Sequence, residues 1–422
     1  MTPIRNILAA AWLLLLAPAT LCAQTTRPAI SLVTFGPGEE LYERFAHNAL
    51  RIQDDAIRPP YNDISFNYGV FAFGDNVLTD FLPGFIQGTQ HYWLAFGPTP
   101  DMLDYYRTTN RTTTIQDLNL TREQSIRLAA FLWDSAKPEN REYIYAPYND
   151  NCSTRVRDAI DRALAHQLKA QTQDIVPHHT YRFHTRRIAA SNPVVFICLE
   201  YILGQDVDKP MTRWQEMYLP ELMQAHLRTV TITQDANTTI PLIRSEQVLY
   251  QATRSNVPDA PPRVLPWFAA AGLLMTATLL MLAQRQQHGL ARIALNTFIL
   301  LWTLLATFAG CIGSYLMFLT NHWATYRNEN LLQMSPIALI LLVLLPWALR
   351  HRTSQPRHPL ASRISQYIAM AMAAGSALGL GLKLLPWFAQ DNWNIIAWVL
   401  PVNIAVAIIL CRRPATDMTK GK

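Results

Sequence analysis

Cys152 stands at a place in the sequence where a thiol can be reactive. The turn-forming run PYNDN precedes it, and STRVRDAIDRALAHQL, which carries apolar residues at helical spacing, follows it. Asn149, Asp150 or Asn151 can cap this helix, so Cys152 falls in its first turn. The unpaired N–H groups and the dipole of a helix N-terminus stabilise a thiolate, and they can hold the oxyanion that forms when an acyl carbon is attacked. The position therefore predicts a cysteine nucleophile.

A nucleophilic cysteine needs a base, and the base needs a partner that orients it. His47 precedes the expected strand NALRIQ, and Asn67 lies in the next expected strand, SFNYGVFAFG. An amide orients the catalytic histidine of papain-like enzymes, so we expect Cys152, His47 and Asn67 to form a catalytic set. The alternative is a buried structural cysteine with an incidental histidine. Other histidines of this half of the chain include His91, His166, His178, His179 and His184.

The first half of the chain predicts strands followed by helices. Expected strands before residue 120 lie at 29–35, 48–53, 65–74, 91–98 and 112–118. Helices are expected over 120–136 with Thr121 as a capping residue, over 152–168, and within 186–203, ending at Gly204. The stretches 229–234 and 247–252 predict a terminal strand pair. Aromatic residues are frequent between 66 and 96, where we expect most of them in the sheet core and, alternatively, some of them along an acyl channel.

The second half is dominated by long uncharged runs. Candidate membrane spans lie at about 264–283, 293–320, 331–349, 364–388 and 393–411. Each is near or above the roughly 18–20 apolar residues that cross a bilayer. The sequence therefore predicts a membrane domain of about five transmembrane helices.

The orientation of these spans follows from charge. Basic residues cluster after the first, third and fifth spans, and the loops after the second and fourth carry little charge. Basic loops stay cytoplasmic, so region 25–260 must lie outside the cytoplasm. The N-terminus agrees, because Arg5, an apolar core and small residues near Ala19 and Ala23 predict a secretory signal peptide cleaved before or at Gln24. An uncleaved anchor helix is the alternative.

Charge and cysteine usage exclude other classes. The net charge of +6 is explained by the basic loops, so no nucleic-acid partner is predicted. The stretch HHTYRFHTRR (178–187) has three histidines but no evident carboxylate or cysteine nearby, so no metal site and no cofactor are predicted. Cys198 lies in the apolar segment VVFICLEYILG, which we interpret as core. A disulfide between Cys152 and Cys198 is the alternative in an oxidising compartment.

Several motifs in order carry a resemblance to a known family. FAHNALRI, FNYGVFAF, YNDNCSTRVRD and DKPMTRWQEMYLP, together with TNHWATYRNENLLQMSP between the second and third spans, resemble the Lnb lipoprotein N-acyltransferase family. The resemblance covers roughly residues 30–225 and the membrane half. It implies an α+β papain-like domain of the permuted NlpC type, related to lecithin:retinol acyltransferase. The family's cysteine falls on Cys152 and its histidine on His47, while Ala46 stands where the family usually has glycine.

The resemblance implies acyl transfer between two lipids. Cys152 would attack a phospholipid ester to form a thioester, and the α-amino group of a lipoprotein's lipidated N-terminal cysteine would then accept the acyl chain. The partners implied are a phospholipid donor, a lipoprotein acceptor and the bacterial inner membrane. Residues expected to contact substrate are Tyr68, Tyr148, Asn151, Arg155, His322 and Asn328.

The expected organisation has five parts: signal peptide 1–24, periplasmic catalytic domain 25–251, linker 252–263, transmembrane domain 264–413 and cytoplasmic tail 414–422. Two other functions remain open. One is a membrane-anchored cell-wall cysteine peptidase or amidase that uses the same Cys–His pair. The other is a non-enzymatic sensor that binds lipid or peptide.

Overall fold

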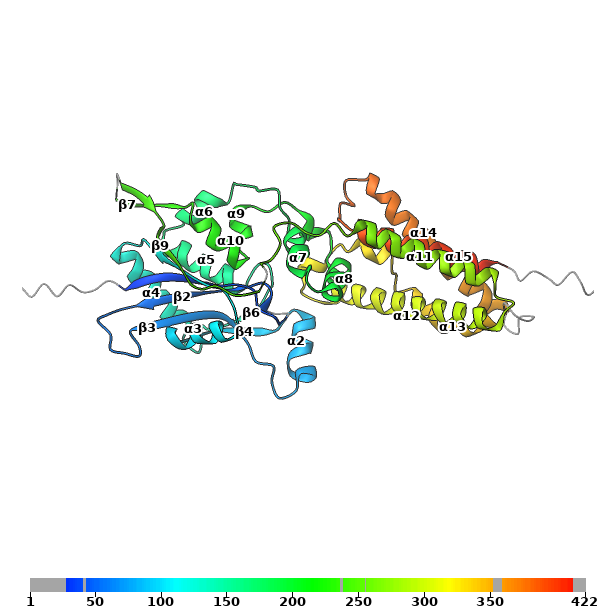
Figure 1. The fold of residues 1–422 in the computed structure, drawn as a ribbon, viewed down its shortest axis with the longest axis horizontal. Coiled ribbons are helices and arrows are strands. Elements are labelled where there is room, and N and C mark those ends of the chain that lie inside the picture. Colours follow the sequence, from blue (N-terminus) through cyan, green and yellow to red (C-terminus); the bar gives the residue numbers. More distant parts are fainter. Residues whose placement is uncertain (1–27, 41–42, 236–237, 255, 352–358, 413–422) are drawn as a thin grey trace, which may run out of the picture.

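The computed structural model describes residues 28–412, apart from 41–42, 236–237, 255 and 352–358. The predicted signal peptide and cytoplasmic tail lie outside the described residues. Two bodies follow one another along the molecule: a sheet-containing domain and a bundle of long apolar helices (Figure 1).

An antiparallel sheet of seven strands forms the centre of the first domain, in the order β6-β4-β3-β2-β1-β5-β9. The bounds are β1 Ala29–Phe35, β2 His47–Gln53, β3 Asp63–Val70, β4 His91–Pro98, β5 Thr113–Leu118, β6 Glu142–Ile144 and β9 Ile243–Tyr250. The five strands expected before residue 120 are confirmed. In Figure 1, β1 runs toward the membrane half, so the antiparallel β2 begins at that end of the sheet.

Helices cover both faces of this sheet. On one face of the sheet, Leu32 and the side chains beside it on the neighbouring strands form one core with α4 (Arg122–Ser135) and α5 (Cys152–Ala163). Val33 and Phe35 belong to a second, smaller core, against which α3 (Thr99–Thr108) packs. Alternating side chains of a strand point to opposite faces, and β1 is apolar on both because both faces are covered. The domain is therefore α+β, while its papain-like type stays a prediction.

One further expectation in this domain is confirmed and one is wrong. The helix expected within 186–203 and ending at Gly204 is α8 (Pro193–Ile202), and a separate helix, α7 (Tyr181–Ala189), precedes it. Asn192 caps α8 and Pro193 occupies its first position, a pairing that starts a new helix and does not continue an old one. The C-terminal stretches do not pair with each other: β7 (Thr231–Asp235) pairs with β8 (Thr238–Pro241), and β9 joins the edge of the main sheet beside β5.

The remaining helices of this domain are short and lie in its second half. They are α6 (Gln167–Thr172), η3 (Gln205–Asp208), α9 (Arg213–Glu216) and α10 (Pro220–Leu227).

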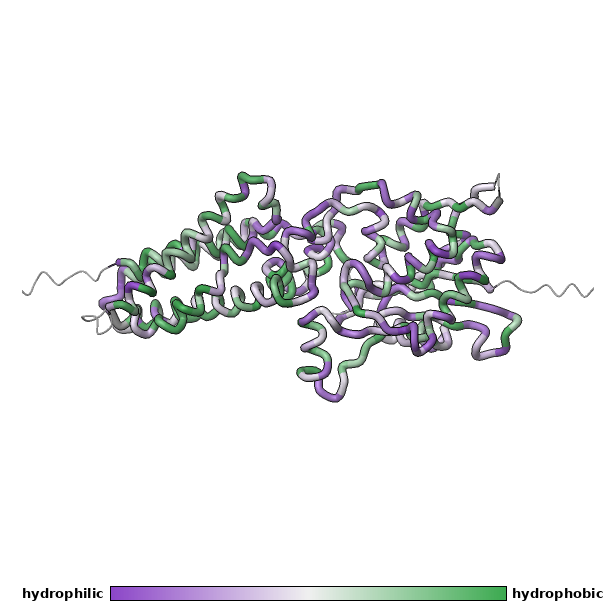
Figure 2. Tube along the Cα trace, turned by 180° about the vertical axis from the view of Figure 1, so that it is seen from behind, coloured by the Kyte–Doolittle hydropathy of each residue, from purple (hydrophilic) through white to green (hydrophobic). Residues whose placement is uncertain are grey.

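The second body contains four helices that are long and apolar enough to cross a membrane. They are α11 (Leu265–Gln284), α12 (Gly289–Leu319), α14 (Pro359–Gly381), extended by η6 (Leu382–Leu384), and α15 (Trp393–Cys411). The expected span 331–349 is a shorter apolar helix, α13 (Ala338–His351), so the count of five is not confirmed. Figure 2 shows these helices as a predominantly hydrophobic bundle.

The charged ends of the bundle fix its orientation. Arg285 and Arg412 follow α11 and α15, and Arg292 and Arg363 lie in the first turns of α12 and α14. These helix ends lie at the end of the bundle away from the sheet (Figure 1). Basic residues remain on the cytoplasmic side, so the sheet domain lies on the opposite side of the membrane.

The chain segment between α12 and α13 makes many of the contacts between the two bodies. This segment contains η4 (Trp323–Thr325) and η5 (Glu329–Leu332). The Gly204 N–H donates to the carbonyl of Ala324 at 2.8 Å, and a side chain at Gly204 would collide with the carbonyl of Tyr326. Arg186 of α7 pairs with Glu200 of α8 and with Asp391 just before α15. The sheet domain is thus docked on the bundle through polar contacts.

Candidate active site

Cys152 is the first residue of α5, as the capping pattern predicts. The residue before it, Asn151, caps the helix: its Oδ1 accepts the N–H groups of Ser153 and Thr154, both at 2.9 Å. Its Nδ2 donates to the carbonyls of Pro147 and Tyr218. Because the cap accepts the next two N–H groups, the N–H of Cys152 itself is the first-turn donor left for an oxyanion. The thiol is free and half-buried.

His47 begins β2, and Asn67 lies beside it on β3. The His47 Nε2 lies 3.2 Å from the Asn67 Oδ1. An amide oxygen accepts a hydrogen bond, so this contact places the ring proton on Nε2 and leaves Nδ1 free to take a proton. Burial and the nearby Arg111 guanidinium lower the pKa of His47 to about 4, against a smaller opposing effect of the bond to Asn67. The ring is therefore neutral at pH 7, which is the state a general base requires.

The residue after His47, Asn48, contacts the Cys152 sulfur through its backbone N–H. The N–H groups of Asn48 and Ser153 and the charge of Arg111 favour the Cys152 thiolate, but burial outweighs them and raises the pKa of Cys152. At neutral pH the Cys152 thiol and the His47 imidazole are thus both uncharged.

A buried side-chain bond fixes β2 against α5. The Asn48 Nδ2 donates to the Ser153 Oγ at 2.9 Å, and the Asn48 Oδ1 accepts from the Thr34 Oγ1 at 2.9 Å. The Ser153 Oγ donates in turn to the carbonyl of Met217 at 2.7 Å. Asn48 and Ser153 directly follow His47 and Cys152, so these bonds hold the two predicted catalytic residues on facing elements.

Two backbone positions of the site lie in the left-handed region. Ala46 has φ 66°, a conformation that favours glycine. Gly69 has φ 91°, and a Cβ added there would lie 3.4 Å from the Cys152 Cβ and 3.7 Å from the Tyr143 hydroxyl oxygen. The glycine of the FNYG motif thus lets the backbone lie against Cys152 without a side chain between them. The left-handed φ of Ala46 explains why the resembled family has glycine before its histidine.

Tyr143 and Arg111 were not expected at the site. The Tyr143 hydroxyl lies beside Cys152, is buried, and has no hydrogen-bond partner among the described residues. Burial and the neighbouring Cys152 raise the pKa of Tyr143, so it keeps its proton and can donate it. Buried Arg111 donates to the carbonyl of Gly36 at 2.8 Å and pairs with Glu43 at 3.2 Å. The nearness of Tyr143 to the PYNDNC turn is a weak sequence signal, whereas nothing in the sequence singles out Arg111.

Three of the expected substrate contacts lie around the catalytic set. Tyr68 is buried with its ring edge-on to Tyr143, the centroids being 6.4 Å apart. Arg155 pairs with Asp150 through two bonds of 2.5 and 2.7 Å and lies over the Tyr143 ring. Asn151 uses its amide as the cap. These side chains therefore build the site, and their contact with substrate stays a prediction.

The other three residues expected to contact substrate lie between the two bodies. The Tyr148 hydroxyl bonds with the Thr185 Oγ1 at 2.9 Å, and its ring packs against Trp323. Asn328 is buried and donates to the carbonyls of Tyr201 and Ile202. The His322 Nε2 lies 2.8 Å from the carbonyl oxygen of Phe85. The structure thus uses these residues for docking, and a role in substrate binding stays untested.

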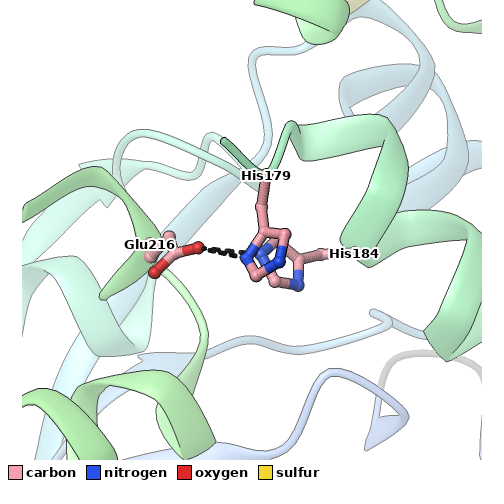
Figure 3. Close-up of side chains that lie close together, drawn as sticks. All are labelled: His179, His184 and Glu216. Carbon is pink, nitrogen blue, oxygen red and sulfur yellow. Dashed lines mark hydrogen bonds and ion pairs between the residues drawn. The ribbon is translucent and has the colours of Figure 1, made fainter. Parts of the chain in front are cut away.

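A second polar cluster corrects the expectation that no carboxylate lies near the histidine-rich stretch. Glu216 is buried, and its Oε1 lies 2.9 Å from the His179 Nδ1 and 3.3 Å from the His184 Nε2 (Figure 3). The donor atoms of these three residues lie within 4.8 Å of one another, as metal ligands can. However, the Arg187 Nε donates to the His184 Nδ1 at 3.0 Å, which places the His184 proton on Nε2, toward Glu216. The cluster is therefore explained as a hydrogen-bond network, which also includes His226 at 2.8 Å from the Glu216 Oε2.

The structure shows an α+β domain with a candidate site at Cys152, His47 and Asn67, carried on a bundle of membrane-capable helices. Residues 20–187 match the family model described as the Lnb N-terminal periplasmic domain, which supports the resemblance to the Lnb family. The chain is thus a membrane protein with a periplasmic N-terminal domain, and the match supports a role in Lnb-like lipoprotein maturation. No curated protein and no solved structure matches it.

Proposed function

We propose that the protein is a lipoprotein N-acyltransferase of the bacterial inner membrane. It transfers an acyl chain from a phospholipid to the α-amino group of a diacylglyceryl-cysteine at a lipoprotein N-terminus, through a thioester on Cys152. The observation that carries the proposal is the hydrogen bond between His47 and Asn67 beside a cysteine at a helix N-terminus. This is the arrangement of nucleophile, base and orienting group that covalent acyl transfer needs.

In the first half-reaction, the His47 Nδ1 takes the Cys152 proton while the sulfur attacks the ester carbonyl carbon. The negative charge moves to the carbonyl oxygen, where the Cys152 N–H and the Tyr143 hydroxyl are the donors in reach of the site. The carbonyl then re-forms, and the bond to the glycerol oxygen breaks. That oxygen takes the proton from His47 and leaves as a lysophospholipid, and the acyl chain remains on sulfur.

In the second half-reaction, the amine of the lipoprotein cysteine attacks the thioester carbon. His47 takes a proton from the nitrogen, the carbon–sulfur bond breaks, and His47 returns that proton to the sulfur. An amide and a free thiol result, so the cycle needs no oxidant, reductant or further co-substrate. The neutral state of both Cys152 and His47 suits this sequence, because the proton moves only as the bond to carbon forms.

The membrane half favours this function over a cell-wall hydrolase. A single anchor suffices to hold a hydrolase at a membrane, whereas four long apolar helices docked onto the catalytic domain fit substrates that are lipids. A pure sensor would not need a thiol, a neutral imidazole and an orienting amide in one place.

The test is mass spectrometry of lipoprotein N-terminal peptides from cells that depend on this protein. Cys152→Ala is expected to abolish the N-acylated form. Cys198→Ala, which removes a free and exposed cysteine of α8, is the matched control and is expected to leave it unchanged. N-acylation that persists in Cys152→Ala cells would refute the thioester route and with it the proposed function.

A further inference from the structure

An apolar segment stands out from the surface of the sheet domain. It consists of the turn η2 (Val77–Phe81) and helix α2 (Leu82–Gln87), here called the η2–α2 flap. None of its residues is buried, and Leu78 is 70% and Phe85 44% exposed, with Val77 and Ile86 also exposed. Contiguous apolar surface on a water-facing domain marks an interaction site.

The flap is fastened to the outer end of a membrane-capable helix. The Gln87 Nε2 donates to the carbonyl of Leu319, the last residue of α12, at 2.6 Å, and the Tyr315 hydroxyl donates to the Gln87 Oε1 at 2.8 Å. The Asn321 N–H donates to the carbonyl of Gln87 at 3.0 Å. Figure 1 shows α2 near the end of α12 that faces the sheet domain, which is the end where a membrane-spanning α12 would leave the bilayer.

A groove of about 650 Å³ separates the flap from α12. Ile312 lies on its α12 side, seven residues before the end of that helix. At a rise of about 1.5 Å per residue, this wall reaches roughly 10 Å along the span. The groove is therefore continuous with the exposed surface of α12, where Ile312 is 38% and Tyr315 39% exposed. Its lining is Pro83, Gly84, Ile86, Gln87, Thr89, Ile312 and Tyr315.

A row of aromatic rings connects the flap with the cysteine. Phe85 stacks on Phe81 at 5.5 Å between centroids, and Phe81 lies 5.3 Å from Phe71. Phe71 follows two residues after Gly69, whose backbone lies against Cys152. The row therefore runs from the flap to Phe71, which packs, as Cys152 does, against the main core of the sheet domain.

We propose that the groove binds one acyl chain of a phospholipid from the outer leaflet, with the η2–α2 flap immersed in that leaflet, and that the aromatic row guides the ester toward Cys152. The occupant follows from the continuity of the groove with the membrane-facing side of α12. This inference rests on the proposed function and names where its donor substrate binds.

The experiment uses the full chain as Cys152→Ala in nanodiscs that contain phosphatidylethanolamine with a diazirine in its acyl chain. After illumination, labelled peptides are identified by mass spectrometry. We expect labels enriched in 83–89 and 312–315, and at least fivefold weaker when Ile86→Trp fills the groove. Ile126→Trp, at an exposed isoleucine of α4, is the matched control and is expected to leave labelling unchanged.

Labels spread evenly over the membrane-facing helices, or unaffected by Ile86→Trp, would overturn the inference. Thermal unfolding of both tryptophan variants shows that the fold is kept, and Leu78→Asp offers a second test, because it is expected to weaken labelling without filling the groove. The result is separate from the function, since Cys152→Ala cannot form a thioester. If the groove of the Cys152→Ala protein is labelled but the parent protein transfers no acyl chain, the proposed function is refuted and the lipid site is supported.

Discussion

The side chain of Asn48 donates a hydrogen bond to that of Ser153 at 2.9 Å, across 105 residues of sequence. Each of these residues directly follows a member of the candidate catalytic pair, His47 and Cys152. The bond is buried and joins the start of β2 to the first turn of α5. The relative position of His47 and Cys152 is thus fixed by a hydrogen bond between the residues that directly follow them.

Removing this bond should disturb activity and stability together. Asn48→Ala leaves the Thr34 hydroxyl without its acceptor and the Ser153 hydroxyl without a donor, at a cost of about 1–3 kcal/mol in the free energy of unfolding. Acyl-enzyme formation should fall more than tenfold, because a shift of the cysteine of about 1 Å is costly. Unfolding curves and single-turnover rates are the measurements. A stable, fully active Asn48→Ala protein would contradict this role.

The pH dependence of thioester formation should report His47. Because burial and Arg111 lower its pKa to about 4, the ring stays neutral well below pH 6. The rate should therefore show no loss near pH 6.5, where an ordinary histidine is protonated, and should fall only as the pH approaches 4. A loss of activity centred near pH 6.5 would show that the ring is exposed and unperturbed.

The same lowered pKa has a consequence for stability. The unfolded chain binds a proton at His47 near pH 6.5, and the folded chain does so only near pH 4. This contribution to stability is therefore complete above pH 6.5 and is lost as the pH falls from 6.5 toward 4. His47→Gln should have a smaller loss of stability across this window than the parent, as measured by urea unfolding at several pH values.

Tyr143→Phe should separate catalysis from stability. Removing a buried hydroxyl that has no partner should leave the free energy of unfolding unchanged or raise it. If the hydroxyl donates to the oxyanion, acyl-enzyme formation should fall by about 10–1,000-fold. Tyr145→Phe, on the adjacent stretch, is the comparison variant. Equal rates in Tyr143→Phe and the parent would exclude the oxyanion role.

How much of this site could be predicted from the sequence depends on how local each signal is. The start of α5 follows from Asn151 and the apolar spacing after it, and both lie within a few residues of Cys152. Arg111 reaches the site only because β5 lies beside β1, at a sequence distance that no local pattern encodes. Tyr143 is likewise brought there by the pairing of β6 with β4.

The expectations about the fold divide in the same way, because local signals were predicted correctly and long-range pairing was not. The five early strands were predicted because their apolar residues and turns are local signals. The partner of β9 was not, because β9 pairs with β5, more than a hundred residues away. Residues 331–337 were assigned to a span by their hydropathy, yet α13 begins only at Ala338. The stretch begins in η5, where Asn330 donates to the carbonyls of Glu200 and Tyr201 on α8, and Pro336, which has no N–H to donate, stands just before α13.

Ala46→Gly should stabilise the protein slightly. A left-handed φ costs an alanine about 1–2 kcal/mol, and glycine offsets part of that gain by its greater freedom in the unfolded chain. A net gain of up to about 1 kcal/mol is expected, measured as a higher unfolding midpoint. Ala170→Gly, at an exposed position inside α6, should instead lose about 1 kcal/mol. A loss at Ala46 equal to that at Ala170 would contradict the strain argument.

Glu216→Gln tests whether the histidine cluster is a hydrogen-bond network or a metal site. Burial raises the pKa of Glu216, but hydrogen bonds from His184, His226 and His179 lower it further, so the net shift is downward. The stability this carboxylate contributes is therefore present above its unfolded pKa and is lost only in strong acid. Replacing it by an amide should cost about 2 kcal/mol at pH 7, while Glu123→Gln, at an exposed position of α4, should cost little. Zinc should leave the unfolding midpoint of the parent unchanged. A rise that Glu216→Gln abolishes would show instead that the cluster binds a metal.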